Sequence, residues 1–395
     1  MRHCFFLFLL ILFCGESISQ RKGLLSKEKQ IACIGFQQLD GGVPLIVCRL
    51  SGIDDTLRFI LDSGSGGVSL DSAFCAQHQF IPAAADSNIS GIGGTVGVDY
   101  LFEKSLIIGS YKTRPMNFHI YDYSQLSAVY GEKIDGVLGF PFISQFLIYI
   151  DNDLLQMEFY PPQKIKYPKN GQLLHPRIAL LPLQHLTIRD KKISKMNFFL
   201  DCGAGLPVLF NESYLGDSAI LRDHKKYFYT RAAGTGGNKQ MRITTVREII
   251  LGKYHFSDVP AYIFKDENNV TAYPFSGGLL GNEILRRFNI VLNYAHSEIH
   301  ITPNTHFQDG FDYGYSGLTL HQYDNKIIVE DVVPESPAAK AGMVVGDELV
   351  GVDQYFSGSL KFFRNLLQQP DKEFKVFVTR KNVLMQLLLK TESIK

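Results

Sequence analysis

The chain has 395 residues, of which 45% are apolar and 20% charged, and its formal net charge at pH 7 is +1. This length exceeds what one hydrophobic core usually organises, so we expect two or three domains. The near-neutral charge and the lack of a strong basic block argue against nucleic acid as a partner. Short apolar runs rich in Phe and Tyr, separated by Gly, Asn and Asp, favour β structure.

Residues 1–19 are typical of a secretory signal peptide. A basic residue precedes an apolar run from Phe5 to Phe13, and Ser17 and Ser19 place small side chains at the two cleavage-site positions. The run is shorter than the ~20 residues that a spanning helix needs. Lipid attachment at Cys14 is disfavoured because a bulky residue precedes it. We therefore expect an exported protein, periplasmic or extracellular, with no transmembrane segment after signal removal.

Four cysteines lie beyond the predicted signal, and no C-x-x-C pair occurs, so a zinc site has little support. If Asp40 and Gly41 form a two-residue turn between two strands, Cys33 and Cys48 fall opposite each other in a hairpin. A disulfide between them, in an oxidising compartment, and a pair of buried thiols remain as alternatives.

An internal repeat runs through the first three hundred residues. FILDSGS (59–65) aligns with FFLDCGA (198–204), and each is followed by a glycine-rich segment, at 90–98 and 232–240. The segments SLIIGSY (105–111) and EIILGKY (248–254) come next. DGVLGFPFISQFLIYID (135–151) then aligns with GGLLGNEILRRFNIVLN (277–293) without a gap. Several blocks in one order indicate an internal duplication.

Each half of the repeat contains a strand that ends in Asp-x-Gly, a glycine-rich hairpin, and an apolar strand that enters a turn and a short helix. Two such lobes, related by a pseudo-twofold axis, would bring equivalent strand ends together, so Asp62 and Asp201 would face each other. A lone Asp at a strand end is more often structural, and only the duplicated context favours catalysis. The glycine spacing in 91–97 does not fit a dinucleotide-binding fingerprint.

The repeated blocks around Asp62 and Asp201 resemble those of a known family. Paired Asp-[Ser/Thr]-Gly-like motifs, each followed by an apolar-apolar-Gly segment, are similar to the duplicated, pepsin-like aspartic proteases, whose lobes are related to the homodimeric retropepsins. DGVLGF (135–140) and LLGNEILRRFNIVLNYAHSEIHI (279–301) are the other segments that carry the resemblance. It covers about residues 31–303 and implies a mainly β, bilobal acid protease fold with pseudo-twofold lobes at 31–162 and 163–303.

The resemblance implies that Asp62 and Asp201 are catalytic and that no metal, cofactor or covalent intermediate is needed. Two carboxyls a few ångströms apart cannot both ionise cheaply, so they share a proton, and one polarises the substrate carbonyl while the other activates a water. The substrate would be an extended peptide or protein. The residues expected to support the dyad are Ser63, Gly64, Ser65, Cys202, Gly203 and Ala204.

The motif after the second acid departs from the family pattern. Cys202 stands where the family has Thr or Ser, and a thiol is a poor donor, so we expect weaker bracing between the lobes on that side than the Ser63 hydroxyl gives. Ser65 has no hydroxyl counterpart, because Ala204 takes its place. We therefore expect the Ser65 hydroxyl to stabilise a negative charge on Asp62, with the proton on Asp201.

The glycine-rich hairpins are expected to act as flaps that close over the substrate. Neither contains the Tyr typical of the long pepsin flap, and one flap per lobe is more similar to the retropepsin arrangement. The flap residues are Gly91, Ile92, Gly93, Gly94, Gly234, Thr235, Gly236 and Gly237.

Residues 314–393 resemble a PDZ domain of the type found in exported bacterial proteases, with SPAAKAG (336–342) and VGDELVGVD (345–353) as the most telling segments. Such domains bind a peptide C-terminus by strand addition, and YSGLTL (315–320) would be the carboxylate loop and first receptor strand. Ser316, Gly317 and Leu318 are the candidate contacts. The alternative is a groove that is occluded or only packs against the protease.

The sequence therefore predicts an exported aspartic endopeptidase whose PDZ domain binds peptide or protein termini. A catalytically degenerate peptide-binding scaffold, which uses the protease cleft and the PDZ groove, is the main alternative, because of Cys202 and the atypical flaps. A regulator that cleaves a single partner is a third.

Overall fold

The structure is a computed structural model, and it describes residues 24–25, 29–84, 87–266, 273 and 275–395. The predicted signal peptide, including Cys14, lies outside these residues. About half of the chain is strand, so the fold is mainly β as predicted. Within the described residues, no helix combines the length and apolar character needed to cross a membrane.

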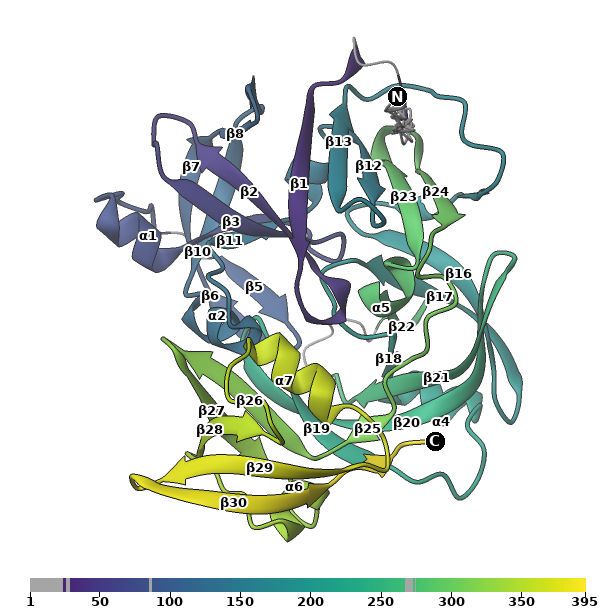
Figure 1. The fold of residues 1–395 in the computed structure, drawn as a ribbon. Coiled ribbons are helices and arrows are strands. Elements are labelled where there is room, and N and C mark those ends of the chain that lie inside the picture. Colours follow the sequence, from purple (N-terminus) through teal and green to yellow (C-terminus); the bar gives the residue numbers. More distant parts are fainter. Residues whose placement is uncertain (1–23, 26–28, 85–86, 267–272, 274) are drawn as a thin grey trace, which may run out of the picture.

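Figure 1 shows a first lobe (residues 31–162, purple to blue) beside a second lobe (163–303, teal to green), with a C-terminal unit (314–393) against both. The elements of the first lobe are β1 (Ala32–Gln38), η2 (Asp40–Gly42), β2 (Pro44–Leu50), β3 (Thr56–Leu61), β4 (Val68–Asp71), α1 (Ser72–Gln77), β5 (Asn88–Gly91), β6 (Gly94–Gly97), β7 (Asp99–Lys104), β8 (Leu106–Ile108), β9 (Tyr111–Lys112), β10 (Met116–Tyr121), α2 (Ser124–Tyr130), β11 (Gly136–Leu138), α3 (Phe140–Ile143), β12 (Leu147–Asp151) and β13 (Gln156–Tyr160).

The second lobe has a similar order of elements, although its described residues contain no counterpart of α2. Its elements are β14 (Gln172–Leu174), β15 (Arg177–Ile178), β16 (Pro182–Arg189), β17 (Ile193–Asp201), β18 (Val208–Asn211), α4 (Glu212–Ser218), β19 (Phe228–Gly234), β20 (Gly237–Leu251), β21 (Tyr254–Phe264), β22 (Ser276–Gly281), α5 (Asn282–Leu285), β23 (Phe288–Asn293), η3 (Tyr294–His296) and β24 (Glu298–Pro303).

Strand pairing around the two acids is the same in both lobes. In the first lobe β11 pairs in parallel with β3 and antiparallel with β4, which pairs in parallel with β10. In the second lobe β22 pairs in parallel with β17 and antiparallel with β18, which pairs in parallel with β21. Such a shared, uncommon pairing pattern supports the duplication inferred from the sequence.

One sheet joins the lobes. The hairpins β12–β13 and β23–β24 end the two lobes, and they pair through β12 and β23 from Leu147↔Asn293 to Ile150↔Ile290. A single hydrophobic cluster extends through both lobes and contains Phe59 and Phe198, the residues that precede each acid by three. The two strand ends that carry Asp62 and Asp201 are therefore held in one rigid core.

The C-terminal unit has a hydrophobic cluster of its own. Its five-stranded sheet has the order β26-β27-β28-β29-β30, so β26 and β30 are edge strands. Its elements are β25 (Gly314–Tyr315), β26 (Leu318–Tyr323), β27 (Lys326–Val332), α6 (Pro337–Lys340), β28 (Glu348–Val352), α7 (Leu360–Leu367), β29 (Glu373–Arg380), β30 (Val383–Lys390) and β31 (Glu392–Ser393).

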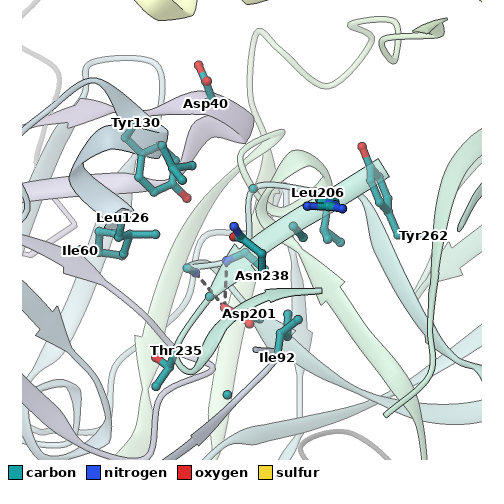
Figure 2. Close-up of a pocket in the computed structure, with 18 of the residues that line it drawn as sticks. Asp40, Ile60, Ile92, Leu126, Tyr130, Asp201, Leu206, Thr235, Asn238 and Tyr262 are labelled. Atoms are coloured by element: carbon teal, nitrogen blue, oxygen red, sulfur yellow. Dashed lines mark hydrogen bonds between the residues drawn. The ribbon is translucent and has the colours of Figure 1, made fainter. Parts of the chain in front are cut away.

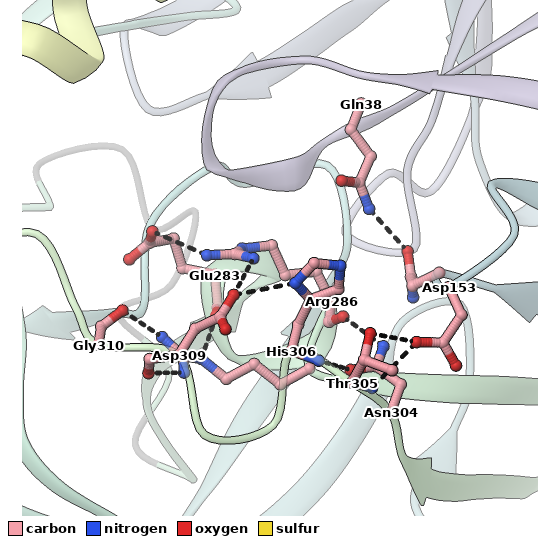
Figure 3. A network of polar contacts seen from close by, with 11 residues as sticks. Gln38, Asp153, Glu283, Arg286, Asn304, Thr305, His306, Asp309 and Gly310 are labelled. Atoms are coloured by element: carbon pink, nitrogen blue, oxygen red, sulfur yellow. Dashed lines mark hydrogen bonds and ion pairs between the residues drawn. The ribbon is translucent and has the colours of Figure 1, made fainter.

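The segment that links the second lobe to the C-terminal unit is tied down by polar contacts (Figure 3). The carboxylate of Asp309 lies 2.9 Å from His306 Nδ1 and 3.6 Å from Arg286 Nη1. Arg287, only 1% exposed, donates to the backbone carbonyls of Asp309 and Gly310. A buried guanidinium is stable only when its donors are satisfied, so these contacts fix the path of the linker and with it the position of the C-terminal unit.

The predicted two-residue turn at Asp40 and Gly41 is wrong. The chain makes a 3-10 turn over Asp40–Gly42, with φ of +65° at Gly41 and +78° at Gly42. The extra residue shifts the β1–β2 register to Phe36↔Ile46, and Cys33 pairs with Glu158 of β13 instead. Cys48 is a free, buried thiol and Cys33 is exposed, so neither alternative is found: the two residues form no disulfide, and they are not a pair of buried thiols.

Candidate active site

The two acids occupy equivalent places at the ends of buried strands. Asp62 directly follows β3, and Asp201 is the last residue of β17. Each of these strands is covered on one side by its parallel neighbour, β11 or β22. The strands run from solvent into the core, so the acids are presented at the interface of the lobes by elements that cannot move independently.

The carboxyl groups of Asp62 and Asp201 hydrogen-bond to each other. Backbone N–H groups of the turns support them from below: Gly64 N–H donates to Asp62 Oδ1 at 2.7 Å, and Gly203 N–H donates to Asp201 Oδ1 at 2.8 Å. Ala204 N–H also donates to Asp201 Oδ1, at 3.1 Å. The dyad is thus held by nearly symmetrical backbone donors.

The turn glycines are required by the closeness of the opposite acid. A Cβ at Gly64 would lie 2.4 Å from Asp201 Cγ, and a Cβ at Gly203 would lie 2.4 Å from Asp62 Cγ. Both distances are far below van der Waals contact, so any side chain at either position would displace the carboxyl of the other lobe. Each turn therefore forms part of the floor for the opposite acid.

Ser63 and Cys202 brace the lobes beneath the dyad. Ser63 Oγ donates to Leu200 O and accepts from Cys202 N–H, both at 2.9 Å. In the opposite direction Cys202 Sγ donates to Leu61 O at 3.2 Å and accepts from Ser63 N–H at 3.3 Å. The thiol therefore makes the full reciprocal set of bonds, although each is longer than its serine counterpart and a thiol donates weakly.

Burial sets the protonation of these groups. It raises the pKa of Asp62, while hydrogen bonds from Asp201 and from the backbone N–H groups of Gly64 and Ser65 oppose the rise. It raises the pKa of Asp201 well above the ordinary value, and the charge of Asp62 adds to the effect. The pair is therefore expected to share one proton that resides on Asp201. Burial also raises the pKa of the Cys202 thiol to about 12, so it stays neutral.

The two predicted glycine-rich hairpins are present, and their tips meet. The first is β5–β6 and the second is β19–β20, with Gly234 paired to Gly237 at its tip. Gly93 N–H donates to Thr235 O at 3.0 Å, and a Cβ at Gly93 would lie 2.2 Å from Gly237 N. The remaining predicted flap residues, Gly91, Ile92, Gly94, Gly234 and Gly236, lie in or beside these tips.

The dyad opens into a cavity of about 810 Å³ between the lobes and under the flaps. Figure 2 shows that Ile60, Leu126 and Tyr130 line it from the first lobe and Leu206 and Tyr262 from the second. Thr235 and Ile92 line the same cavity from the two flap tips. Apolar walls on both sides of a pair of carboxyls are suited to an extended chain with apolar side chains.

Comparison with protein families agrees with this geometry. A family model described as aspartyl protease matches residues 46–142 and 185–284, one segment in each lobe and each with one acid of the dyad. A second model, described as PDZ domain, matches residues 328–380. The chain contains an aspartyl protease domain and a PDZ domain. No curated protein matched the chain in a separate search.

The predicted carboxylate loop of the PDZ domain, Ser316 to Leu318, leads into the edge strand β26, which begins at Leu318. Gly317 has a φ of +74°, and a Cβ there would lie 2.2 Å from Ser336 Cβ, so only glycine fits. The Leu318 N–H group donates a long, 3.3 Å bond to Ser316 Oγ. All three residues line the same cavity as the protease dyad.

One predicted role in the protease domain is wrong, and one contact was missed. The Ser65 hydroxyl donates to Gly67 O at 3.1 Å and does not support Asp62. Asp62 instead accepts a hydrogen bond from the backbone N–H group of Ser65. Tyr121, at the end of β10, accepts a 3.2 Å bond from Gly236 N–H and so holds the tip of the second flap. Nothing in the sequence around Tyr121 indicates this, because the contact joins residues 115 positions apart.

Proposed function

We propose that this protein is an aspartic endopeptidase that hydrolyses extended polypeptides with the Asp62–Asp201 dyad. The observation that carries the proposal is the pair of mutually hydrogen-bonded, partly buried carboxyls, held by equivalent backbone donors at the floor of a cavity under two flaps. The aspartyl protease match to both lobes supports it. Retention of this geometry disfavours the degenerate scaffold, because a scaffold has no need to bury two acids against each other at an energetic cost.

The proton distribution assigns different roles to the two acids. Asp62, as the anion, takes a proton from a water molecule while the water oxygen attacks the substrate carbonyl carbon, and Asp201 gives its proton to the carbonyl oxygen. When the tetrahedral intermediate breaks down, Asp62 passes its proton to the leaving nitrogen and Asp201 recovers a proton from a hydroxyl of the intermediate. The dyad then returns to its starting state, with one proton on the pair.

The flaps and the apolar walls would select and enclose the substrate. The contact between Gly93 N–H and Thr235 O closes the cavity from above, so a polypeptide enters only when the tips separate. Ile60 and Val137 on one side of the dyad, and Phe199 and Leu279 on the other, favour apolar residues on both sides of the scissile bond.

We propose further that the protein is exported, to a periplasmic or extracellular location. The support is the pattern of residues 1–19, with its apolar run and small residues at the cleavage-site positions. N-terminal sequencing of the protein from its host is the test, with a mature chain that begins at Gln20 as the expected result and an intact Met1 as the contrary one.

Cleavage of a peptide library tests the enzymatic proposal. Asp62→Asn should abolish cleavage, while the matched control Asp54→Asn, at an exposed position in the turn before β3, should cleave as the wild type does. A peptide with a hydroxyl group in place of the scissile amide should inhibit, because it resembles the tetrahedral intermediate. Equal background cleavage by wild type and Asp62→Asn would instead favour a peptide-binding scaffold.

A further inference from the structure

The PDZ domain and the protease dyad share one cavity. The space of about 810 Å³ that contains Asp62 and Asp201 is also lined by Ser316, Gly317 and Leu318 of the carboxylate loop. It continues along the first half of β26 and past Arg364 and Leu367 of α7. A peptide-binding loop and a hydrolytic site in two different domains therefore face the same solvent space.

The usual approach to a PDZ groove is closed at its outer end. A peptide adds to the free edge of the receptor strand, here β26, and α7 forms the opposite wall. The residue that follows α2 of the protease, Gly131, lies between these walls: a Cβ there would be 2.8 Å from Gln322 Oε1 and 3.2 Å from Leu360 Cβ. The end of α2 thus fills the part of the groove where the upstream residues of a ligand would lie.

Side chains of α7 cross the middle of the groove and bind the protease. Arg364 donates to Leu320 O on β26 and forms an ion pair with Asp40, its Nη1 atom 2.5 Å from Asp40 Oδ2. Lys361 Nζ donates to Gln38 O at 2.8 Å. The turn around Asp40 is therefore held against α7, and β26 beyond Leu320 is not accessible to an added strand.

The inner end of the groove remains open towards the dyad and is fixed to the second flap. Tyr315 Oη donates to Tyr229 O at 2.8 Å, and Arg231 pairs with Asp331 at 3.2 Å. Tyr229 and Arg231 both belong to β19, the arm of that flap. The carboxylate loop thus keeps a set position beside the cleft, and its Leu318 N–H group makes a long, 3.3 Å bond within the loop.

We propose that the carboxylate loop of the PDZ domain is a terminal subsite of the protease, which holds the free C-terminal carboxylate of a polypeptide that already lies in the cleft. This inference rests on the proposed endopeptidase function and names its substrate class: chains with a free C-terminus, cut at a set number of residues from that end. Backbone N–H groups of Ser316 to Leu318 would bind the carboxylate. Hydrogen bonds to a charged group are stronger than those between neutral groups. Both arginines near the loop already have acidic partners, so the loop itself supplies the recognition.

The test uses one peptide sequence that the wild-type protein cleaves, made with a free carboxylate and with a C-terminal amide. We expect amidation to lower kcat/KM at least about tenfold, since it removes a hydrogen-bonded charge. We also expect the cleavage position to move by two residues when two residues are added at the C-terminus of the free acid. Equal rates for acid and amide, or a cleavage site that stays with the sequence, would overturn the proposal.

Matched variants connect the effect to the loop. Ser316→Asp places a negative charge beside the bound carboxylate and should lower kcat/KM for the free acid about tenfold more than it does for the amide. Ser357→Asp, an exposed position on the PDZ domain, should change neither. An equal loss for both peptides in Ser316→Asp would contradict a carboxylate subsite. Failure of the endopeptidase proposal is distinguishable, because the wild type would then cleave neither peptide.

Discussion

The two lobes of the protease domain repeat one strand topology but differ in the side chains that support each acid. In the first lobe Ser63 and Ser65 follow Asp62, whereas Cys202 and Ala204 follow Asp201. The backbone donors are nevertheless equivalent, with bonds of 2.7 Å from Gly64 and 2.8 Å from Gly203. The symmetry of the site therefore resides in the backbone donors, whereas the side chains that follow the two acids differ.

The flaps differ more than the dyad turns do. The first flap, β5–β6, forms a separate two-stranded sheet, whereas the arm of the second is continuous with the eight-stranded sheet of its lobe. The second flap also contacts Tyr121 and, through Tyr229, the PDZ domain. The described contacts therefore predict that the first flap moves more readily, and that the second is an anchored wall of the cleft.

Apart from substitution of the two acids themselves, the largest expected effect comes from the turn glycines, where the lobes are most alike. Gly64→Ala and Gly203→Ala should each lower kcat/KM at least about 100-fold, because a Cβ would displace the opposite carboxyl by a large fraction of an ångström. Steady-state cleavage of one peptide measures this. Gly216→Ala, in α4 with open space around it, is the control and should remain active. A clear difference between the losses of kcat/KM in Gly64→Ala and Gly203→Ala would show that the two turns do not support the dyad equally.

The bracing pair gives the next largest effect. Cys202→Ala leaves Ser63 N–H and Leu61 O buried without their partner, which should lower the free energy of unfolding by about 2–4 kcal/mol. Cys202→Ser should keep stability close to that of the wild type, since a hydroxyl can make both bonds. Urea denaturation is the measurement, and Cys48→Ala is the control for loss of a buried sulfur. If Cys202→Ala costs no more than Cys48→Ala, the thiol does not brace the lobes.

The contact that anchors the second flap should have a smaller effect. Tyr121→Phe removes the hydroxyl that accepts from Gly236 N–H, and we expect a fall of about fivefold in kcat/KM from a loss near 1 kcal/mol. Tyr111→Phe, at an exposed position on β9, is the matched control. Unchanged kinetics in Tyr121→Phe would mean that the contact between the two flap tips, and not Tyr121, keeps the second flap in its closed position.

The smallest expected effect is at Ser65. At low pH the activity falls because Asp62 gains a proton. If the Ser65 hydroxyl stabilised the Asp62 anion, its removal would raise the pKa of Asp62. The acid limb of the pH profile would then move to higher pH. The Ser65 hydroxyl instead binds Gly67 O, and the backbone N–H groups survive the substitution. We therefore expect Ser65→Ala to leave the acid limb of the kcat/KM profile in place. An acid limb that moves to higher pH in Ser65→Ala would instead support stabilisation of the Asp62 anion by the Ser65 hydroxyl, as predicted from the sequence.

The sequence predicted the features that depend on local pattern. The paired Asp-x-Gly turns, the glycine-rich hairpins and the PDZ helix after Ser336 each follow from a few adjacent residues, and the family matches agree on both domains. The turn around Asp40 was mispredicted because a long-range approach decides it: a Cβ at Gly41 would lie 2.2 Å from Gly205 O. The Ser65 rotamer, the Tyr121 contact and the docking of α7 on Asp40 depend on tertiary packing in the same way.

The shared-proton dyad is tested by comparing single and double variants of the two acids. If Asp62 and Asp201 act as one shared-proton unit, Asp62→Asn and Asp201→Asn should each lower kcat/KM at least about 1,000-fold, and the double variant should be no worse than either single one. Retention of activity within tenfold of wild type in either single variant, or losses that multiply in the double variant, would contradict the account.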